Sequence, residues 1–329
     1  MEKAGLQRGY YIIIAVMVVL PLVLGGLKAG NFYLHVLIML GIFTILGSGI
    51  NLLMGFTGQA SIGHAAFFGI GAYVSTLLMM KLNFPFWVAL PLAGVAGAVA
   101  GLLIGYPSLR LKGISFAIVT FAFGELVKMI FVNWKSLTNG QDGLTDIPSP
   151  ALWGINFAAK LPYTYLVMIF TLFALFLVDR IVNSRVGKAF ISIREDEDLA
   201  ASTGVNVMQY KILSFVISTF LAGIAGSLYA HYMHFINPAD FTVAISMTLI
   251  AIVVIGGLGT IIGPILGSLV LLFMPEVLRP VKDYYYLIFG MILIVVMIFA
   301  PVGIMGGLQA LSRKKASGRT ETVSEGKAS

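Results

Sequence analysis

Long apolar runs separated by short polar segments account for most of the chain. A helix that crosses the hydrocarbon core of a bilayer needs about 20 mostly apolar residues. Ten runs have close to this length: residues 10–27, 33–54, 60–81, 86–106, 113–134, 162–182, 211–235, 242–258, 260–278 and 284–303. The pattern therefore predicts an all-α polytopic membrane protein in a lipid bilayer, with about ten transmembrane helices (8–10).

The composition points to the same class of protein. Of the 329 residues, 59% are hydrophobic and 11% are charged, and the mean hydropathy is +0.97. Soluble globular domains carry roughly 25% charged residues, so that class is excluded. The absence of cysteine excludes disulfides and thiolate metal sites. In a membrane protein a net charge of +7 marks cytoplasmic loops rather than a nucleic-acid partner.

The placement of the basic residues predicts the orientation of the chain. With the N-terminus inside, 14 Lys and Arg residues fall in inner segments and 6 in outer segments, and cytoplasmic segments carry such an excess. Both termini are therefore predicted to be cytoplasmic. The transmembrane domain, residues 1–311, has two long loops: residues 135–161 outside (the outer loop) and residues 183–210 inside (the inner loop). Residues 312–329 read as a disordered cytoplasmic tail.

A glycine-rich, polar stretch interrupts the apolar pattern near residues 55–73. Non-helical backbone at membrane depth is tolerated only against protein or a water-filled cavity. One interpretation is an interrupted span that lines a translocation path. Close helix packing through Gly and Ser is the alternative. The candidate path residues here are Asn51, Gln59, Ser61 and His64.

Two ionisable residues fall inside the predicted span 113–134. Glu125 and Lys128 are three residues apart, so they share one face of a helix. Ionisable groups this deep usually face a bundle interior or a cavity rather than lipid. Both are therefore candidates for the path, with a purely structural ion pair as the alternative.

Three further patterns bear on function. Gly259, Gly263 and Gly267 repeat every four residues and predict a small-residue stripe for close helix packing. His231 and His234 share a helical face, but a zinc site needs three or four fixed ligands, so we expect interfacial hydrogen bonds and no metal. The chain contains no G-x-x-x-x-G-K-[ST], H-E-x-x-H or G-x-S-x-G motif. No enzymatic activity and no cofactor are predicted.

The inner loop carries the densest charge in the chain. Val186, Ala189, Phe190 and Ile193 form one apolar helical face, four acidic residues follow, and Gly204 is a natural helix stop. Such a helix, lying parallel to the membrane, suits a groove on a partner. An ordinary solvated loop is the alternative.

The residues from Gly55 to Tyr73 follow the pattern GxxGQxSxGHAxFxGxGAY, which resembles the signature of branched-chain amino acid ABC importer permeases of the M-type membrane subunit. The resemblance extends through the segments 114–143, 184–204, 254–267 (VIGGLGTIIGPILG) and 299–307 (FAPVGIMGG). It covers roughly residues 33–307.

The resemblance implies a permease subunit in the bacterial inner membrane. The implied partners are a second homologous permease, two cytoplasmic ABC ATPases and an extracytoplasmic solute-binding protein. The inner loop would then be the ATPase-coupling segment. The family pattern E-A-A-x-x-x-G there matches Asp198-Leu199-Ala200-x-x-x-Gly204, with Asp and Leu in place of the first two residues. The implied coupling residues are Phe190, Arg194, Glu195, Asp198, Ala200 and Gly204.

Two other functions remain open from the sequence. One is the same type of importer with another cargo, such as urea, short amides or other amino acids. The other is a secondary transporter in which Glu125 carries a proton and no ATPase is needed.

Overall fold

The computed structural model describes residues 20–23, 25, 26, 30–152, 155–277, 290, 291 and 303–305. Most of the predicted spans 10–27 and 284–303 and all of the predicted tail 312–329 lie outside these residues. The long helices are α2 (Gly30–Asn51), α3 (His64–Leu82), α4 (Phe86–Ser108), α5 (Ile114–Asn133), α7 (Lys160–Val182) and α10 (Val207–Met233).

The shorter elements lie between and after these helices. The α-helices among them are α6 (Lys135–Thr138), α8 (Arg185–Glu195), α9 (Glu197–Ser202), α11 (Val243–Gly256) and α12 (Gly263–Val277). The others are a π-helical turn η1 (Leu52–Phe56), two 3₁₀ turns η2 (Gly140–Asp142) and η3 (Pro238–Phe241), and a small antiparallel hairpin of β1 (Ala151–Leu152) and β2 (Ile155–Asn156).

Six helices are long and apolar enough to cross a membrane in the described part of the chain, counting α2 together with η1. They coincide with six of the predicted spans. The helices α11 and α12 are apolar but shorter, at the positions of the predicted pair 242–258 and 260–278. The all-helical class is therefore confirmed, with six candidate spans and two shorter apolar helices in the described residues.

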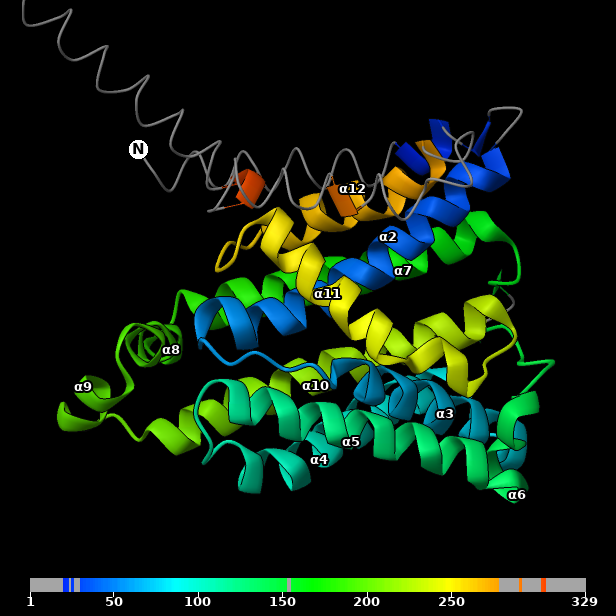
Figure 1. Cartoon of the computed structure of the whole chain (residues 1–329). Coiled ribbons are helices and arrows are strands. Elements are labelled where there is room, and N and C mark those ends of the chain that lie inside the picture. The colour runs from blue at the N-terminus through cyan, green and yellow to red at the C-terminus, as the bar shows by residue number, and fades with distance from the viewer. Residues whose placement is uncertain are drawn as a thin grey trace, which may run out of the picture.

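Helix α10 lies in the middle of the bundle, between α2 and α7 on one side and α3, α4 and α5 on the other (Figure 1). Several of its contacts with α3 and α4 are made through glycine, beside side-chain contacts such as Phe67 with Phe215. A Cβ atom at Gly71 of α3 would overlap the backbone of Gly223, and one at Gly97 of α4 would overlap the carbonyl of Thr219. Small residues let helix backbones approach this closely, which explains the glycine content of the three helices.

The two ends of the bundle carry different structures. Helices α8 and α9 lie at one end and α6 at the other (Figure 1). At the α6 end, the outer loop is fastened to the end of α10. Leu144 pairs with Ile236 in an antiparallel bridge, and the Nδ1 atoms of His231 and His234 lie 2.9 and 2.7 Å from the carbonyl oxygens of Pro148 and Ile147. The two histidines therefore make the expected hydrogen bonds.

Candidate functional site

The chain leaves the helical conformation between α2 and α3. The π-helical turn η1 ends at Phe56, and residues 57–63, which we call the connector, are not helical. The Thr57 hydroxyl donates to the carbonyl of Leu52 at 3.0 Å, and the backbone N–H of Gln59 donates to the carbonyl of Leu53 at 3.0 Å. These bonds satisfy carbonyls that the end of a helix would otherwise leave without a partner.

The connector brings the start of α3 into the interior of the bundle. The backbone N–H of Ile62 donates to the Thr120 hydroxyl of α5 at 3.1 Å, and the N–H of Ala65 donates to the Ser246 hydroxyl of α11 at 2.9 Å. A Cβ atom at Gly63 would overlap the Thr120 carbonyl. Most of the non-helical backbone is thus covered by protein, as membrane depth requires, whereas Gly58 is exposed.

The interruption is shorter than the glycine pattern near 55–73 suggests. Gly69 and Gly71 lie within the regular helix α3. Gly69 packs against the rings of Phe241 and Phe131, and Gly71 packs against α10. These two glycines therefore serve close packing, and the break itself is confined to the connector.

Three of the candidate path residues meet at this break. Gln59, Ser61 and His64 are all buried. The His64 Nε2 atom lies 3.4 Å from the Ser218 hydroxyl of α10. The Ser61 hydroxyl and the His64 Nδ1 atom have no hydrogen-bond partner among the described residues. The connector and the first residue of α3 thus place buried polar atoms in the bundle that form no hydrogen bond with the described residues.

The fourth candidate, Asn51, has a different environment. Its side-chain amide donates to the carbonyl of Thr260 at 2.8 Å and accepts from the N–H of Gly259 at 2.9 Å. Both groups belong to the turn between α11 and α12. Asn51 therefore fastens the end of α2 to this turn, with both ends of its amide occupied.

The predicted glycine stripe is divided between two structures. Gly263 and Gly267 lie in α12, where added Cβ atoms would overlap backbone near the end of α11 and the carbonyl of Ile252. Gly259 lies before α12, with φ of +70°. Glycine suits this turn because residues with a side chain rarely adopt a positive φ. The N–H of Gly259 also donates the hydrogen bond to Asn51.

The inner loop folds as the two helices α8 and α9. The hydroxyl of Ser184 caps α8 by accepting from the N–H of Val186 at 3.1 Å. Phe190 is fully buried and packs edge-on against Tyr210 of α10. The predicted apolar face of α8 therefore attaches the helix to its own chain, and Phe190 offers no surface to a partner.

The four consecutive acidic residues each have an intramolecular role. Glu195 pairs with Arg194, and the Asp196 carboxylate caps α9 by accepting from two backbone N–H groups. The carboxylate of Glu197 lies 2.6 Å from the ammonium of Lys211. The segment is therefore helical with defined side-chain contacts, while Glu195, Asp196 and Asp198 remain exposed to solvent.

The last of the four, Asp198, forms an exposed ion pair with Lys112 at 2.8 Å. The hydrogen bond from Lys112 lowers the pKa of the Asp198 carboxyl below its ordinary value. The same bond raises the pKa of the Lys112 ammonium. The pair links the inner loop to the segment between α4 and α5.

The exposed part of the inner loop lies at α9. Ala200 is buried, whereas Leu199 is 62% exposed. Gly204 ends this region with φ of +86° and open space around it. Leu199 is absent from the predicted contact residues, although its position in the motif, next to Asp198, could have identified it as one. It is the large apolar side chain that this part of the loop presents to solvent.

The ionisable pair on α5 also forms. The ammonium of Lys128 and a carboxylate oxygen of Glu125 are 3.7 Å apart, and both side chains are about one-third exposed. Helix α5 is the least buried of the six long helices. The pair therefore lies on a side of the bundle that the described protein leaves partly uncovered.

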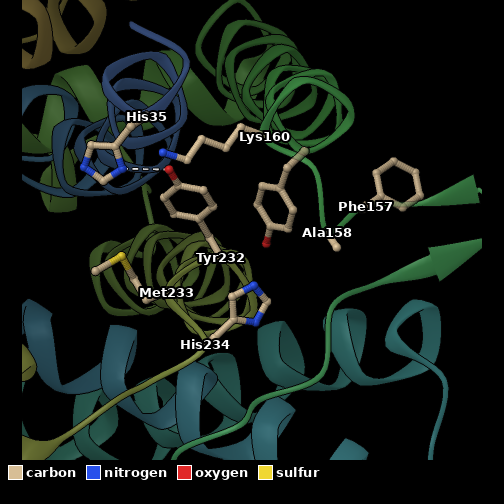
Figure 2. A pocket seen from close by; sticks show the side chains of 8 residues that line it. His35, Phe157, Ala158, Lys160, Tyr232, Met233 and His234 are labelled. Carbon is tan, nitrogen blue, oxygen red and sulfur yellow. Dashed lines mark hydrogen bonds between the residues drawn. The ribbon is translucent and has the colours of Figure 1, made fainter. Parts of the chain in front are cut away.

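A pocket of about 220 Å³ lies at the opposite end of α10 from the inner loop. Figure 2 shows His35, Lys160, Tyr232 and His234 around it, with the His35 Nδ1 atom 2.6 Å from the Tyr232 hydroxyl. Small-molecule sites are usually larger, from about 300 Å³ upwards. No group of three or more potential metal ligands gathers in the described residues.

A bundle of membrane-length helices that encloses a non-helical, polar connector is typical of membrane transport proteins. The comparisons with known proteins define the class further. The family model described as "branched-chain amino acid transport system / permease component" matches residues 32–297. The chain belongs to this family of membrane permeases.

Several characterised relatives are similar over most of the chain. The high-affinity branched-chain amino acid transport system permease protein LivM of Salmonella typhimurium is 35% identical over 287 residues, covering 80% of this chain and 68% of the relative. LivM of Escherichia coli strain K12 is 34% identical with the same coverage. LivH of that strain is 27% identical, covering 80% of this chain and 91% of the relative. No solved structure matches the chain.

Proposed function

We propose that this protein is a membrane-spanning permease subunit of an ATP-binding-cassette importer for branched-chain amino acids in a bacterial inner membrane. The observation that carries the proposal is the family match over residues 32–297. The LivM relatives, similar over 80% of the chain, are named as permeases of branched-chain amino acid transport. The proposed topology keeps about ten spans, with both termini cytoplasmic.

The proposed complex contains a second, homologous permease. The similarity to both LivM and LivH, two permeases named for one kind of transport system, supports such a pair. The partly uncovered Glu125–Lys128 pair supports a protein neighbour for α5, because ionisable groups facing lipid are costly. We therefore place the second permease and the translocation path against α5.

Two cytoplasmic ATPases are the proposed partners of the inner loop. Helix α8 is attached to its own chain by Phe190, so α9, Leu199 and Gly204 form the surface that a partner could contact. An exposed apolar side chain on a structured helix suits a hydrophobic groove. On the other side of the membrane, the outer loop is the proposed contact for the solute-binding protein.

The proposed mechanism is alternating access, in which parts of a transporter rock around a path. ATP supplies the free energy, so the path needs no proton-carrying carboxylate. Gln59 and Ser61 of the connector and His64 at the start of α3 are the proposed path residues. The Ser61 hydroxyl and the His64 Nδ1 atom, both buried without a hydrogen-bond partner in the described residues, support this role. Asn51 is not retained as a path residue, since both ends of its amide are occupied.

The proposal is tested by affinity purification of the tagged protein from solubilised native membranes, followed by reconstitution. We expect two ATPases and a second permease to co-purify, and the complex with its binding protein to take up leucine when ATP is present. Competition by urea or short amides but not by isoleucine would contradict the proposed cargo. Uptake by the chain alone, abolished by Glu125→Gln, would contradict the importer and favour a proton-coupled transporter.

A further inference from the structure

Arg194, at the end of α8, points into its own chain rather than away from it. Its Nη1 atom donates to the carbonyl oxygen of Gly55 at 2.7 Å, across 139 positions of sequence. Its Nη2 and Nε atoms donate to one carboxylate oxygen of Glu195 at 2.5 and 3.2 Å. The guanidinium group therefore binds two acceptors of its own chain at once.

The carbonyl of Gly55 is an acceptor that the chain must satisfy. It belongs to the last turn of η1, immediately before the chain becomes non-helical. The final carbonyls of a helix lack intrahelical partners, and they carry the partial negative charge of the helix dipole. A cationic donor at this position satisfies both conditions, and Arg194 supplies it from another element.

A second element meets the same point. A Cβ atom at Gly259, in the turn between α11 and α12, would lie 2.9 Å from Arg194 Nη1 and 3.0 Å from the Gly55 carbonyl. A Cβ atom at Gly58 of the connector would lie 3.1 Å from Arg194 Cγ. The N–H of Gly259 is in turn held by Asn51. We call Asn51, Gly55, Gly58, Arg194 and Gly259 the Arg194 junction.

We infer that Arg194 is a positioning residue that joins α8 to the end of α2 and to the turn between α11 and α12. A displacement of α8 then moves both elements, and with them the connector. This inference rests on the proposed function, in which ATPases act on α9 and α8. It assigns Arg194 to the permease itself rather than to the surface in contact with the ATPase.

The geometry also explains why the residue is arginine. The planar guanidinium presents several donors in fixed directions, whereas a lysine ammonium is a point charge on a flexible chain. A lysine at this position would keep the charge but could not hold both acceptors in the same geometry. Arg194→Lys is therefore the informative variant beside Arg194→Gln.

The test uses the complete reconstituted complex with its ATPases and binding protein. For both variants we expect unchanged co-purification of the ATPases and nearly unchanged ATP hydrolysis. Leucine taken up per ATP hydrolysed should fall about tenfold, the effect of losing one charge-assisted hydrogen bond. This ratio is the readout that a merely structural role would not move, because loss of folded protein lowers uptake and hydrolysis together.

Arg110→Gln is the matched control. Arg110 precedes α5 at the same end of the bundle and packs over the ring of Tyr106 at 5.2 Å, outside the junction. We expect its uptake per ATP to equal that of the unmodified complex. Normal uptake per ATP in both Arg194 variants, or loss of the ATPases from an otherwise folded variant, would overturn the inference. Failure of the unmodified protein to retain ATPases would instead overturn the proposed function.

Discussion

The inner and outer loops are both long polar segments in the sequence, but the structure holds them in different ways. The inner loop is held by side chains: Phe190 is buried, and Glu197 and Asp198 form ion pairs with Lys211 and Lys112 outside the loop. The outer loop is held mainly through its backbone, by the Leu144–Ile236 bridge and by histidines on the carbonyls of Ile147 and Pro148. Side-chain attachment makes the inner loop a firm extension of α10, suited to transmitting force.

The largest expected effect comes from the buried aromatic of the inner loop. Phe190→Ala should lower the free energy of unfolding by about 3–5 kcal/mol, since it removes a fully buried phenyl ring. The measurement is the melting temperature and yield of the detergent-solubilised protein. Phe173→Ala, on the 48% exposed Phe173 of α7, is the control and should change little. Equal losses for both variants would contradict the anchoring role of Phe190.

A smaller effect on stability is expected from the ion pair between Glu197 of α9 and Lys211 of α10. Glu197→Gln leaves the Lys211 ammonium, only 1% exposed, without its charged partner. We expect a loss of roughly 2 kcal/mol, less than for a fully enclosed pair because Glu197 keeps contact with solvent. The double variant Glu197→Gln/Lys211→Met should recover most of the melting temperature. A double variant as unstable as the single one would show that the charge pairing is not what holds the loop.

The corresponding change in the outer loop should be more local. His231→Leu removes the bond to Pro148 and the contact of His231 Nε2 with the Ser75 hydroxyl at 2.9 Å. Losing a hydrogen bond of this kind costs about 1 kcal/mol. We expect faster limited proteolysis within residues 135–161 and an unchanged rate within residues 183–210. Equal acceleration at both loops would remove the distinction between them.

The smallest effect on stability is expected at the exposed tip of the inner loop. Leu199→Asp should change the free energy of unfolding by less than about 0.5 kcal/mol, as is usual for surface positions. If α9 contacts the ATPase, however, the variant should lose its ATPases during purification. Ser202→Asp, at another exposed position of α9, is the matched control. Retention of the ATPases by Leu199→Asp would move the contact away from α9.

The sequence predicts the long helices well because each one corresponds to a continuous run of about 20 apolar residues. The amphipathic helix at α8 is also confirmed, since its apolar face repeats within 11 residues. The family is confirmed as well. The path and coupling roles of the candidate residues stay predictions.

The hydrophobic and polar pattern of the sequence could not predict hydrogen-bond partners that are distant in the chain. Asn51 binds a turn 208 positions away, and Arg194 binds a carbonyl 139 positions away. Both appear locally as polar residues in a polar segment, which fits a path or a partner contact equally well. The π-helical turn is also invisible, because hydrophobic periodicity cannot distinguish it from one more turn of α-helix over five residues.

The glycine contacts of α10 have a consequence for motion. Where backbone meets backbone, as between Gly71 and Gly223 and between Gly97 and Thr219, no side-chain rotamer is frozen on contact, and none is available to rearrange when the helices shift. At these points the interface cannot adapt gradually by repacking. We therefore expect α3, α4 and α10 to move together as one rigid body during a transport cycle.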